Sequence, residues 1–261
     1  VQKFDPNGNV TGVELMKMLL CMIGYKADIQ GYTGNGWQTN VLVDAATSGL
    51  SANFIPSVYG ATPRQWTARL MTNALDAKYV VYSKGELTYG ENTYAEQFLG
   101  LRTAEGTLVE TNNNKWEEET AGKIQNTLNN SDQVKVKTDK DTVTAVGDTD
   151  DSLLGLPVKM YYKKAGTTAE AKLYAVLPYS KDQKVITTAV DAVKVDGTKV
   201  TVEGLGTQDY AGKTFDVYSN NVLVQKGASS IDKYLGNNVN DQVTLITAPN
   251  SNRIQTIKLH T

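Results

Sequence analysis

The sequence predicts an α+β protein, in which an N-terminal helical segment is followed by antiparallel all-β modules. Up to about residue 100, apolar side chains recur with the 3.6-residue period of amphipathic helices. After that point, short segments rich in Val, Thr and Tyr alternate with period two, and Gly, Asn and Asp turns separate them. A gapped internal repeat lies within this second part, which indicates more than one β module.

The first helix is expected to begin at Thr11 and to end near Gly24. Thr11 and Glu14 form a capping-box pattern, in which each side chain accepts a hydrogen bond from the other residue's amide. The oxygen-bearing side chains that start at Asp5 also fit part of a calcium loop, but its twelfth position is Met16, which cannot bind calcium. We therefore interpret FDPNGNVTGVE as a turn that leads into a helix.

Two longer helices and one short helix should follow. Apolar residues recur at every fourth position from Trp37, and Gly49 is placed to end this helix in the left-handed conformation. Thr62 is expected to cap the third helix, with Gln65 completing a second capping box. A shorter helix is predicted over residues 93–100.

Short strands are expected throughout the second part, and Asp196-Gly197 is a strong signal for a hairpin turn between two of them. The segment 112–120 is instead expected to be a loop or a short amphipathic turn around Trp116. The expected strands are 106–111, 133–138, 142–146, 157–164, 171–178, 199–204, 214–219, 221–227, 242–249 and 253–259.

The repeat aligns residues 143–176 with residues 222–259. Each copy has a strand, a polar turn, a short Leu-Gly helical turn and then a hairpin of two strands. The sequence therefore predicts three parts, which are a helical segment over 1–100 and two β modules over 101–190 and 191–261.

Composition excludes several classes of protein. The 26 Lys and Arg residues against 28 Asp and Glu residues give a net charge of −2, so no basic surface for nucleic acid is expected. The apolar stretches are too short to span a membrane. The chain opens abruptly in a turn, which is typical of a piece of a longer protein.

The sequence offers little for catalysis. The single cysteine, Cys21, lies in the apolar first helix and is expected to be buried as a small hydrophobic residue. The single histidine, His260, lies next to the C-terminus, where fraying is expected. A nucleophile–histidine site would depend on this one imidazole, and a His/Cys metal cluster cannot be assembled, so we predict no catalytic residues, cofactor or metal. The Asp-rich turns at 138–141 and 148–151 could hold calcium, although turn chemistry accounts for most of each.

The helical half resembles S-layer homology repeats. FDPNGNVTGVELMKMLLCMIGY is similar to the end of one repeat, whose motif is Phe-x-Pro-Asn, then Thr-Arg-Ala-Glu, then an apolar helix. GWQTNVLVDAATSGL and ATPRQWTARLMTNAL look like the Trp-led and Thr-led helices of the next repeat. The resemblance covers about residues 4–76, and the β half is similar in style to regions that follow such repeats in clostridial-type surface proteins.

The resemblance implies a helical bundle on a secreted protein of the bacterial cell envelope, with grooves for a pyruvylated wall polysaccharide. In this family the motif Arg is important for the anionic ligand. Thr11, Glu14 and Thr62 match the motif, but Gly12 and Pro63 stand where the motif has Arg. The resemblance therefore supports the inherited fold better than it supports polysaccharide binding.

Two further residues complete the candidate wall-polymer site, which comprises Thr11, Glu14, Trp37, Thr62 and Arg64. Arg64 stands one position later than the motif Arg, which turns its side chain about 100° further around the helix. It would be a cation beside a helix N-terminus, where anions are already favoured, or an ordinary solvated residue. Trp37 and Trp66 could stack on sugar rings, but their helical spacing favours packing against the core.

The resemblance thus implies a noncatalytic, extracellular protein of the bacterial cell wall or S-layer, whose helical segment serves wall attachment or surface assembly. Its expected partners are an anionic cell-wall polysaccharide and copies of itself or neighbouring surface proteins. Two alternatives are the noncatalytic part of a wall-associated enzyme and a carbohydrate-binding adhesive module. The adhesive alternative requires an exposed strip formed by the tyrosines of the β half, such as Tyr161, Tyr162, Tyr174, Tyr179, Tyr210 and Tyr218.

Overall fold

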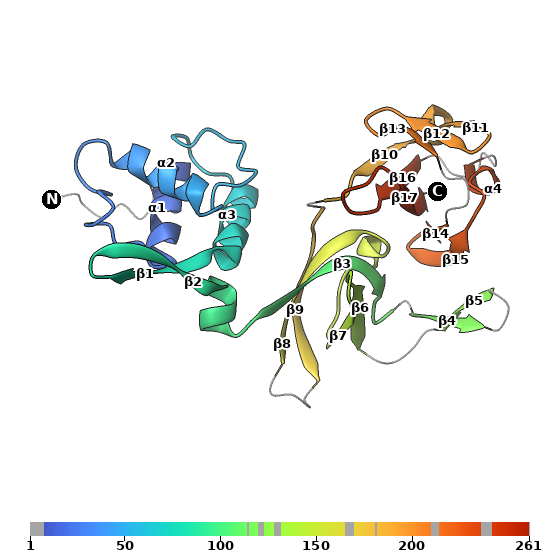
Figure 1. Cartoon of the computed structure of the whole chain (residues 1–261), viewed down its shortest axis with the longest axis horizontal. Helices are drawn as coiled ribbons and strands as arrows, with labels where there is room; N and C mark the ends of the chain where they lie inside the picture. The colour runs from blue at the N-terminus through green and yellow to red at the C-terminus, as the bar shows by residue number, and fades with distance from the viewer. Residues whose placement is uncertain are drawn as a thin grey trace. The chain divides into compact units, whose positions relative to one another are not determined.

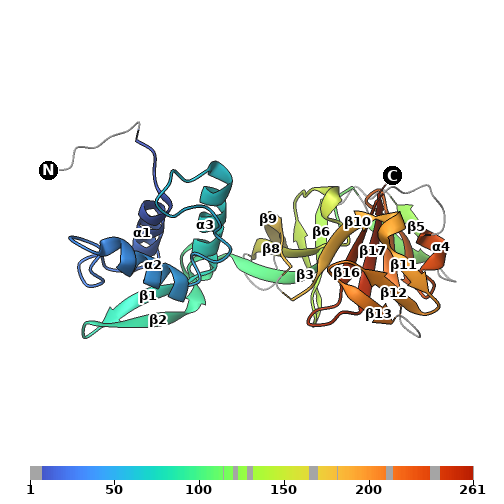
Figure 2. The same ribbon diagram turned by 90° about the horizontal axis from the view of Figure 1, so that it is seen from above.

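A computed structural model of the chain divides into two compact units, Val1–Leu101 and Arg102–Thr261 (Figures 1 and 2). The first unit contains the long helices and one hairpin, and the second consists mainly of antiparallel sheets, so the fold is mixed and rich in strands. The structure describes residues 8–113, 115–119, 123–127, 132–164, 170–180, 182–209, 214–235 and 242–260.

The helices of the first unit begin close to where the sequence places them. They are α1 (Gly12–Met22), α2 (Trp37–Thr47) and α3 (Arg64–Asp76). The capping box at the start of α1 is confirmed, with Thr11 as the N-cap residue. Gly49, just beyond α2, has the predicted left-handed conformation, with φ of +79°.

The prediction that the first 100 residues are helical is wrong for residues 78–93. This segment forms a hairpin of β1 (Lys78–Ser83) and β2 (Glu86–Thr93). Its turn residues Lys84 and Gly85 have φ of +52° and +87°, as a two-residue hairpin turn requires. The segment KYVVYS is β-branched and aromatic, which favours a strand over a helix.

The short helix expected over 93–100 is a five-residue π-helix, η1 (Ala95–Leu99). Its first turn has the reciprocal bonds of a capping box, because Thr93 N donates to Glu96 Oε2 and Glu96 N donates to Thr93 Oγ1. Gly100 then ends the turn with φ of +63°.

One apolar core holds the first unit together. Leu20, Val41 and Leu70 bring the three helices into it, and Val80 adds the hairpin, which lies alongside the helices in both views (Figures 1 and 2). The expectation that Cys21 is buried is wrong, since its side chain is exposed. The apolar run of α1 covers more of the helix surface than its neighbours bury, and Met18 and Met22 are exposed as well.

A closed five-stranded barrel opens the second unit, with strand order β3-β6-β7-β9-β8. Neighbouring strands are antiparallel except β7 and β9, which form a parallel bridge at Val146 and Lys172. The segment around Trp116, expected to be a loop, contributes to a separate hairpin of β4 and β5. The bounds are β3 (Arg102–Glu110), β4 (Lys115–Glu119), β5 (Lys123–Thr127), β6 (Gln133–Lys137), β7 (Thr142–Val146), β8 (Pro157–Lys164) and β9 (Ala171–Pro178).

An open five-stranded sheet follows, with order β10-β16-β17-β14-β15. A separate, smaller sheet consists of β11, β12 and β13, and the hairpin predicted at Asp196-Gly197 joins β11 to β12. The bounds are β10 (Val185–Ala189), β11 (Lys194–Asp196), β12 (Lys199–Val202), β13 (Gly206–Asp209), β14 (Phe215–Ser219), β15 (Val222–Ala228), β16 (Gln242–Thr247) and β17 (Ile254–His260).

The two five-stranded structures have the same order of elements. In each, a hairpin is followed by a short helix, η2 (Asp151–Leu153) or α4 (Asp232–Leu235), and then by a second hairpin. Strand β10, which lies just before the boundary predicted at residue 190, pairs with β16 in the open sheet. Strand β10 of the open sheet corresponds to β3 of the barrel. Each pairs antiparallel with the first strand of the second hairpin, which is β16 in the open sheet and β8 in the barrel.

The barrel and the open sheet share a core. Tyr218 of β14 and Leu223 of β15 belong to the buried cluster of the barrel, together with Leu108 and Met160. Gly155, which has φ of +77°, lies so close to the Tyr218 ring that a Cβ atom there would be 2.7 Å from the ring. Within the described residues, no helix is long and apolar enough to cross a membrane.

Candidate functional site

The structure pairs the two segments that carry four of the five predicted site residues, Thr11 and Glu14 on one and Thr62 and Arg64 on the other. The segments before α1 and α3 are joined by an antiparallel bridge between Thr11 and Ala61. Thr62 N donates to Val10 O at 2.9 Å, and Gly12 N donates to Gly60 O at 3.3 Å. The N-termini of the two helices therefore start from paired backbone segments, although their residues lie about 50 positions apart in the sequence.

The polar groups of Thr11 and Glu14 are occupied by the cap. Glu14 N donates to Thr11 Oγ1 at 3.4 Å, and Thr11 N donates to Glu14 Oε2 at 2.9 Å. The Thr11 hydroxyl also donates to Glu14 Oε2, at 2.8 Å. The backbone and side-chain hydrogen bonds from Thr11 lower the pKa of Glu14, so this carboxylate is ionised and would repel an anion.

The prediction that Thr62 caps the third helix is wrong. Pro63 is the N-cap residue, and no side chain caps the helix, so the second capping box with Gln65 does not form. The reason is tertiary, because the backbone of Thr62 extends away to pair with Val10. The Thr62 hydroxyl is left buried, and it has no hydrogen-bond partner among the described residues.

Arg64 is the first residue of α3, and its side chain is exposed. Beside it, the half-buried Trp66 meets the ring of Phe54 edge to face, with centroids 5.8 Å apart, so Trp66 packs inward as expected. The start of α3 thus presents one cation and uncapped backbone N–H groups, which together suit an anion.

Trp37 is not joined to these residues by any described contact. It starts α2, packs partly buried against the core, and lies under the ammonium of Lys17, 4.8 Å from the ring centroid. Lys17 is fixed there because its Nζ donates to the carbonyl of Tyr32 at 2.7 Å. One face of the indole is therefore already covered by a cation, which leaves little aromatic surface for a sugar.

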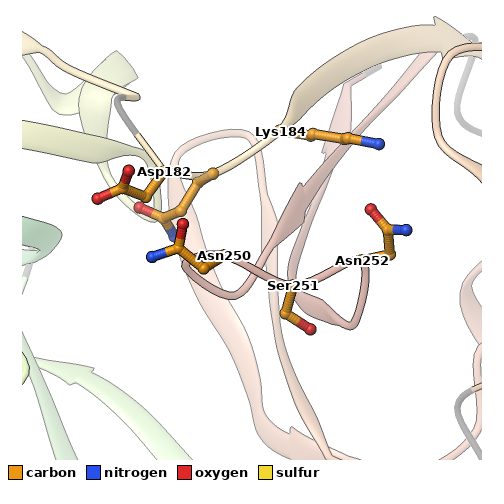
Figure 3. Close-up of a pocket in the computed structure, with 6 residues that line it drawn as sticks. Asp182, Lys184, Asn250, Ser251 and Asn252 are labelled. Carbon is orange, nitrogen blue, oxygen red and sulfur yellow. The ribbon is translucent and has the colours of Figure 1, made fainter.

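A polar pocket that sequence reasoning missed lies in the second unit (Figure 3). Its volume is about 370 Å³, and Figure 3 shows Asp182 and Lys184 on one segment facing the turn between β16 and β17. Asn250 N donates to Asp182 O at 2.6 Å, and Lys184 N donates to the side-chain Oγ1 of Thr247 at 2.9 Å, so hydrogen bonds hold both walls. The lining residues are Asp182, Gln183, Lys184, Asn250, Ser251 and Asn252.

The pocket offers a carboxylate, an ammonium, amides and a hydroxyl, which suits a small polar ligand and provides no activated nucleophile. The polar runs SKDQK and PNSNR are signals for it in the sequence. Nothing in those runs, however, shows that the two segments face each other.

The tyrosines of the β half do not form the exposed strip that an adhesive surface requires. Tyr161 and Tyr218 are buried, Tyr162 and Tyr179 are half-buried, and Tyr174 is exposed. Tyr210 lies outside the described residues. The observation that would favour an adhesive module is therefore missing from the described part of the β half.

His260 is not frayed as expected, because it ends strand β17. Its Nε2 is 2.8 Å from the hydroxyl of Thr244, which in turn is 2.8 Å from the hydroxyl of Thr187. Desolvation, and to a smaller extent the charge of Lys258, lower the pKa of His260. Thr244 is buried, so this pair lacks the accessible nucleophile of a hydrolytic site.

The Asp side chains of the two Asp-rich turns form hydrogen bonds within their own turns. Asp141 Oδ1 accepts from the Thr138 hydroxyl at 2.8 Å, and Asp150 Oδ1 accepts from Ser152 N at 2.8 Å. Among the described residues, no group of three or more His, Cys, Asp or Glu side chains could hold a metal ion. Of the calcium loop considered from Asp5, the first three positions, including Asp5 and Asn7, lie outside the described residues.

Comparisons with family models, with curated proteins and with solved structures found no match to this chain.

Proposed function

We propose that this chain is a noncatalytic protein of the bacterial cell envelope, located outside the cell in the wall or S-layer. Its first unit serves attachment to an anionic wall polysaccharide or assembly with neighbouring surface proteins, and its β modules project from that unit. The proposal starts from the resemblance to S-layer homology repeats in residues 4–76.

The observation that supports it best is the pairing of the two motif segments. The bridge at Thr11 and Ala61 places the starts of α1 and α3 together, as a site built from two repeats requires. At the start of α3, the exposed Arg64 lies next to uncapped backbone N–H groups. Because helix N-termini favour negative charge, these groups are suited to a carboxylate or a phosphate on a polymer.

Binding by this segment should be weak. Gly12 and Pro63 occupy the positions of the motif arginines, so each motif has lost a charge-assisted contact, and Glu14 adds an ionised carboxylate nearby. Such contacts contribute about 1.5–3 kcal/mol each, which corresponds to roughly tenfold to a hundredfold in affinity.

The test is sedimentation of the purified chain with purified cell walls, comparing Arg64→Ala with Arg69→Ala. Both arginines are exposed on α3, but only Arg64 lies at its start, so Arg69→Ala is a matched control for lost charge. We expect salt-sensitive binding that Arg64→Ala weakens by roughly tenfold or more and that Arg69→Ala leaves nearly unchanged. Tight, salt-resistant binding that neither substitution alters would show that another surface binds the wall.

A further inference from the structure

One lysine of the second unit is almost completely buried. The side chain of Lys258, on β17, is 3 % exposed. Its Nζ donates to the carbonyl of Ser152 at 2.5 Å and to Asn221 Oδ1 at 3.3 Å. In the described part of the chain it forms no salt bridge, although the charge of Asp150 acts on it from nearby.

A buried ammonium without a paired carboxylate is costly, so burial favours the neutral amine. Desolvation lowers the pKa of Lys258 to about 8, and the Asp150 charge opposes this shift only in part. The titratable group on the same strand that interacts with it is His260, whose pKa is lowered by desolvation and by the charge of Lys258. A neutral amine held against a side-chain carbonyl is a nucleophile beside an electrophile.

We propose that Lys258 and Asn221 form an intramolecular isopeptide bond. The Nζ of Lys258 attacks the side-chain carbonyl carbon of Asn221, a C–N bond forms, and the amide nitrogen of Asn221 leaves. The balance is Lys–NH₃⁺ plus Asn–CONH₂ giving Lys–NH–CO–Asn plus NH₄⁺. No oxidant or other reactant is needed.

The fold holds the two partners in position. Asn221 lies in the turn between β14 and β15, where Asn220 and Asn221 have φ of +48° and +65°, as a two-residue hairpin turn requires. Strand β17 runs parallel to β14, with Lys258 beside Tyr218 in the register. Because rigid elements fix both side chains, the reacting groups meet at no further entropic cost.

Ser152 positions the amine, and Asp150 transfers the proton. The Ser152 carbonyl accepts an N–H of the amine and holds Nζ beside the side-chain amide of Asn221. Asp150, the N-cap residue of η2, lies beyond salt-bridge distance of Nζ, so the proton released from Nζ reaches its carboxylate through solvent and returns from there to the departing ammonia. Because the carboxylate gives back the proton that it takes, it is unchanged at the end.

The bond would fasten the last strand to the β14–β15 turn and replace a buried charge by a neutral amide. It closes a covalent ring over residues 221–258, so pulling on the C-terminal strand could not peel it from the sheet. This inference is independent of wall binding, since it involves only groups of the second unit.

The experiment is mass spectrometry of the full chain after incubation at pH 8. We expect a mass lower by about 17 Da, the loss of one ammonia, and a tryptic product that joins peptides 214–226 and 254–261. Asn221→Gly and Lys258→Met should abolish this product. Asn220→Gly, which replaces the neighbouring turn residue with the same positive φ, should leave it intact.

The joined peptide distinguishes this bond from a succinimide at Asn35-Gly36, which loses the same mass but leaves linear peptides. Release of the linear peptide 254–258 together with an unmodified peptide 214–226 from the folded protein would overturn the proposal. The measurement on the unsubstituted chain is decisive even if a variant fails to fold.

Discussion

The barrel and the open sheet of the second unit are built from the same succession of elements and close differently. In the barrel, the last strand β9 takes β7 as its parallel neighbour, and the sheet closes through β3. In the open sheet, the last strand β17 takes β14 instead, and β10 and β15 remain at the edges. Local sequence thus determines the order of elements, but it does not determine which strands finally pair.

Burial explains the difference. Along β9, buried and exposed residues largely alternate, as in a strand with one solvated face. Along β17, nearly every residue is buried, including Lys258, because one face meets the core of the sheet and the other lies towards the η2 turn of the barrel. A strand covered on both faces belongs in the middle of a sheet, and β17 has this position.

The largest expected effect comes from removing the side chain through which the open sheet enters the barrel core. Tyr218→Ala should destabilise the second unit by about 3–5 kcal/mol, the usual cost of truncating a buried aromatic residue. Because Tyr218 belongs to the buried cluster of the barrel, the variant should also unfold in two steps, one for each sheet. Urea unfolding followed by two probes measures both effects.

Tyr174→Ala is the control for Tyr218→Ala, since Tyr174 lies in the barrel but is 55 % exposed. We expect it to cost less than about 1 kcal/mol and to leave a single transition. Equal effects of the two substitutions would contradict a shared core.

The next effect tests the contact between Gly155, which follows η2, and the ring of Tyr218 on β14. Gly155→Ala should cost about 2–4 kcal/mol, from the positive φ and from the overlap of a Cβ with the Tyr218 ring. Gly197→Ala, where φ is also positive but no atom lies within 4 Å, should cost only about 1 kcal/mol for the backbone. Thermal unfolding of the pair isolates the contact, and equal costs would show that the ring moves aside freely.

The buried Lys258 of the open sheet should make the stability of the second unit depend on pH. Its folded-state pKa of about 8 is below its ordinary value of 10.5, so between these values the unfolded chain binds more protons and stability rises with pH. With the amine free, as in Asn221→Gly, we expect a gain of about 2 kcal/mol from pH 8 to pH 10. An isopeptide bond removes this titration, so the unsubstituted chain should show no such gain.

Denaturation at pH 8 and pH 10 measures this difference, with Lys258→Met as the control that lacks the amine. Above about pH 10 the sign reverses, because burial raises the pKa of Tyr25, Tyr32 and Tyr218 and only the unfolded chain loses those protons. An equal gain in the unsubstituted chain and in Asn221→Gly would indicate that Lys258 is free in both.

Much of this architecture could be predicted from the sequence, because its signals are local. The cap at Thr11, the turn at Gly197 and the order of elements in the repeat all depend on residues within a few positions of each other. The hairpin at residues 78–93 was missed for a different reason. Its alternation is short, and it follows three helices in the chain.

The candidate sites depend on distant residues, and the sequence could not place them. Lys258 and Asn221 are 37 positions apart, and Lys258 and Ser152 are 106 apart, so only the parallel pairing of β14 with β17 and the packing on η2 bring them together. The pocket of Figure 3 likewise joins two polar segments, 182–184 and 250–252, and most strands of the open sheet lie between them in the sequence. Arg64 was recognised because its neighbours in the sequence carry the motif. Whether Thr62 caps α3, in contrast, depended on the pairing of its backbone with the segment before α1.

The smallest expected effect concerns the starts of α1 and α3 in the first unit, where similar local sequences are capped differently. Thr11 and Thr62 have similar capping patterns in the sequence, but only the Thr11 hydroxyl accepts a hydrogen bond from its helix. Thr11→Ala should therefore cost about 1 kcal/mol, and Thr62→Ala, which removes an unpartnered buried hydroxyl, should be neutral or slightly stabilising.

The pH dependence of the Thr11 effect provides a second test of the cap. Hydrogen bonds from Thr11 lower the pKa of Glu14, so their stabilisation is present above the ordinary pKa of a glutamate and is lost as pH falls through the folded-state value. The cost of Thr11→Ala should accordingly shrink in acid, whereas the effect of Thr62→Ala should not change with pH. Thermal unfolding of both variants at neutral and acidic pH measures this, and equal costs for both would mean that Thr62 caps its helix in solution.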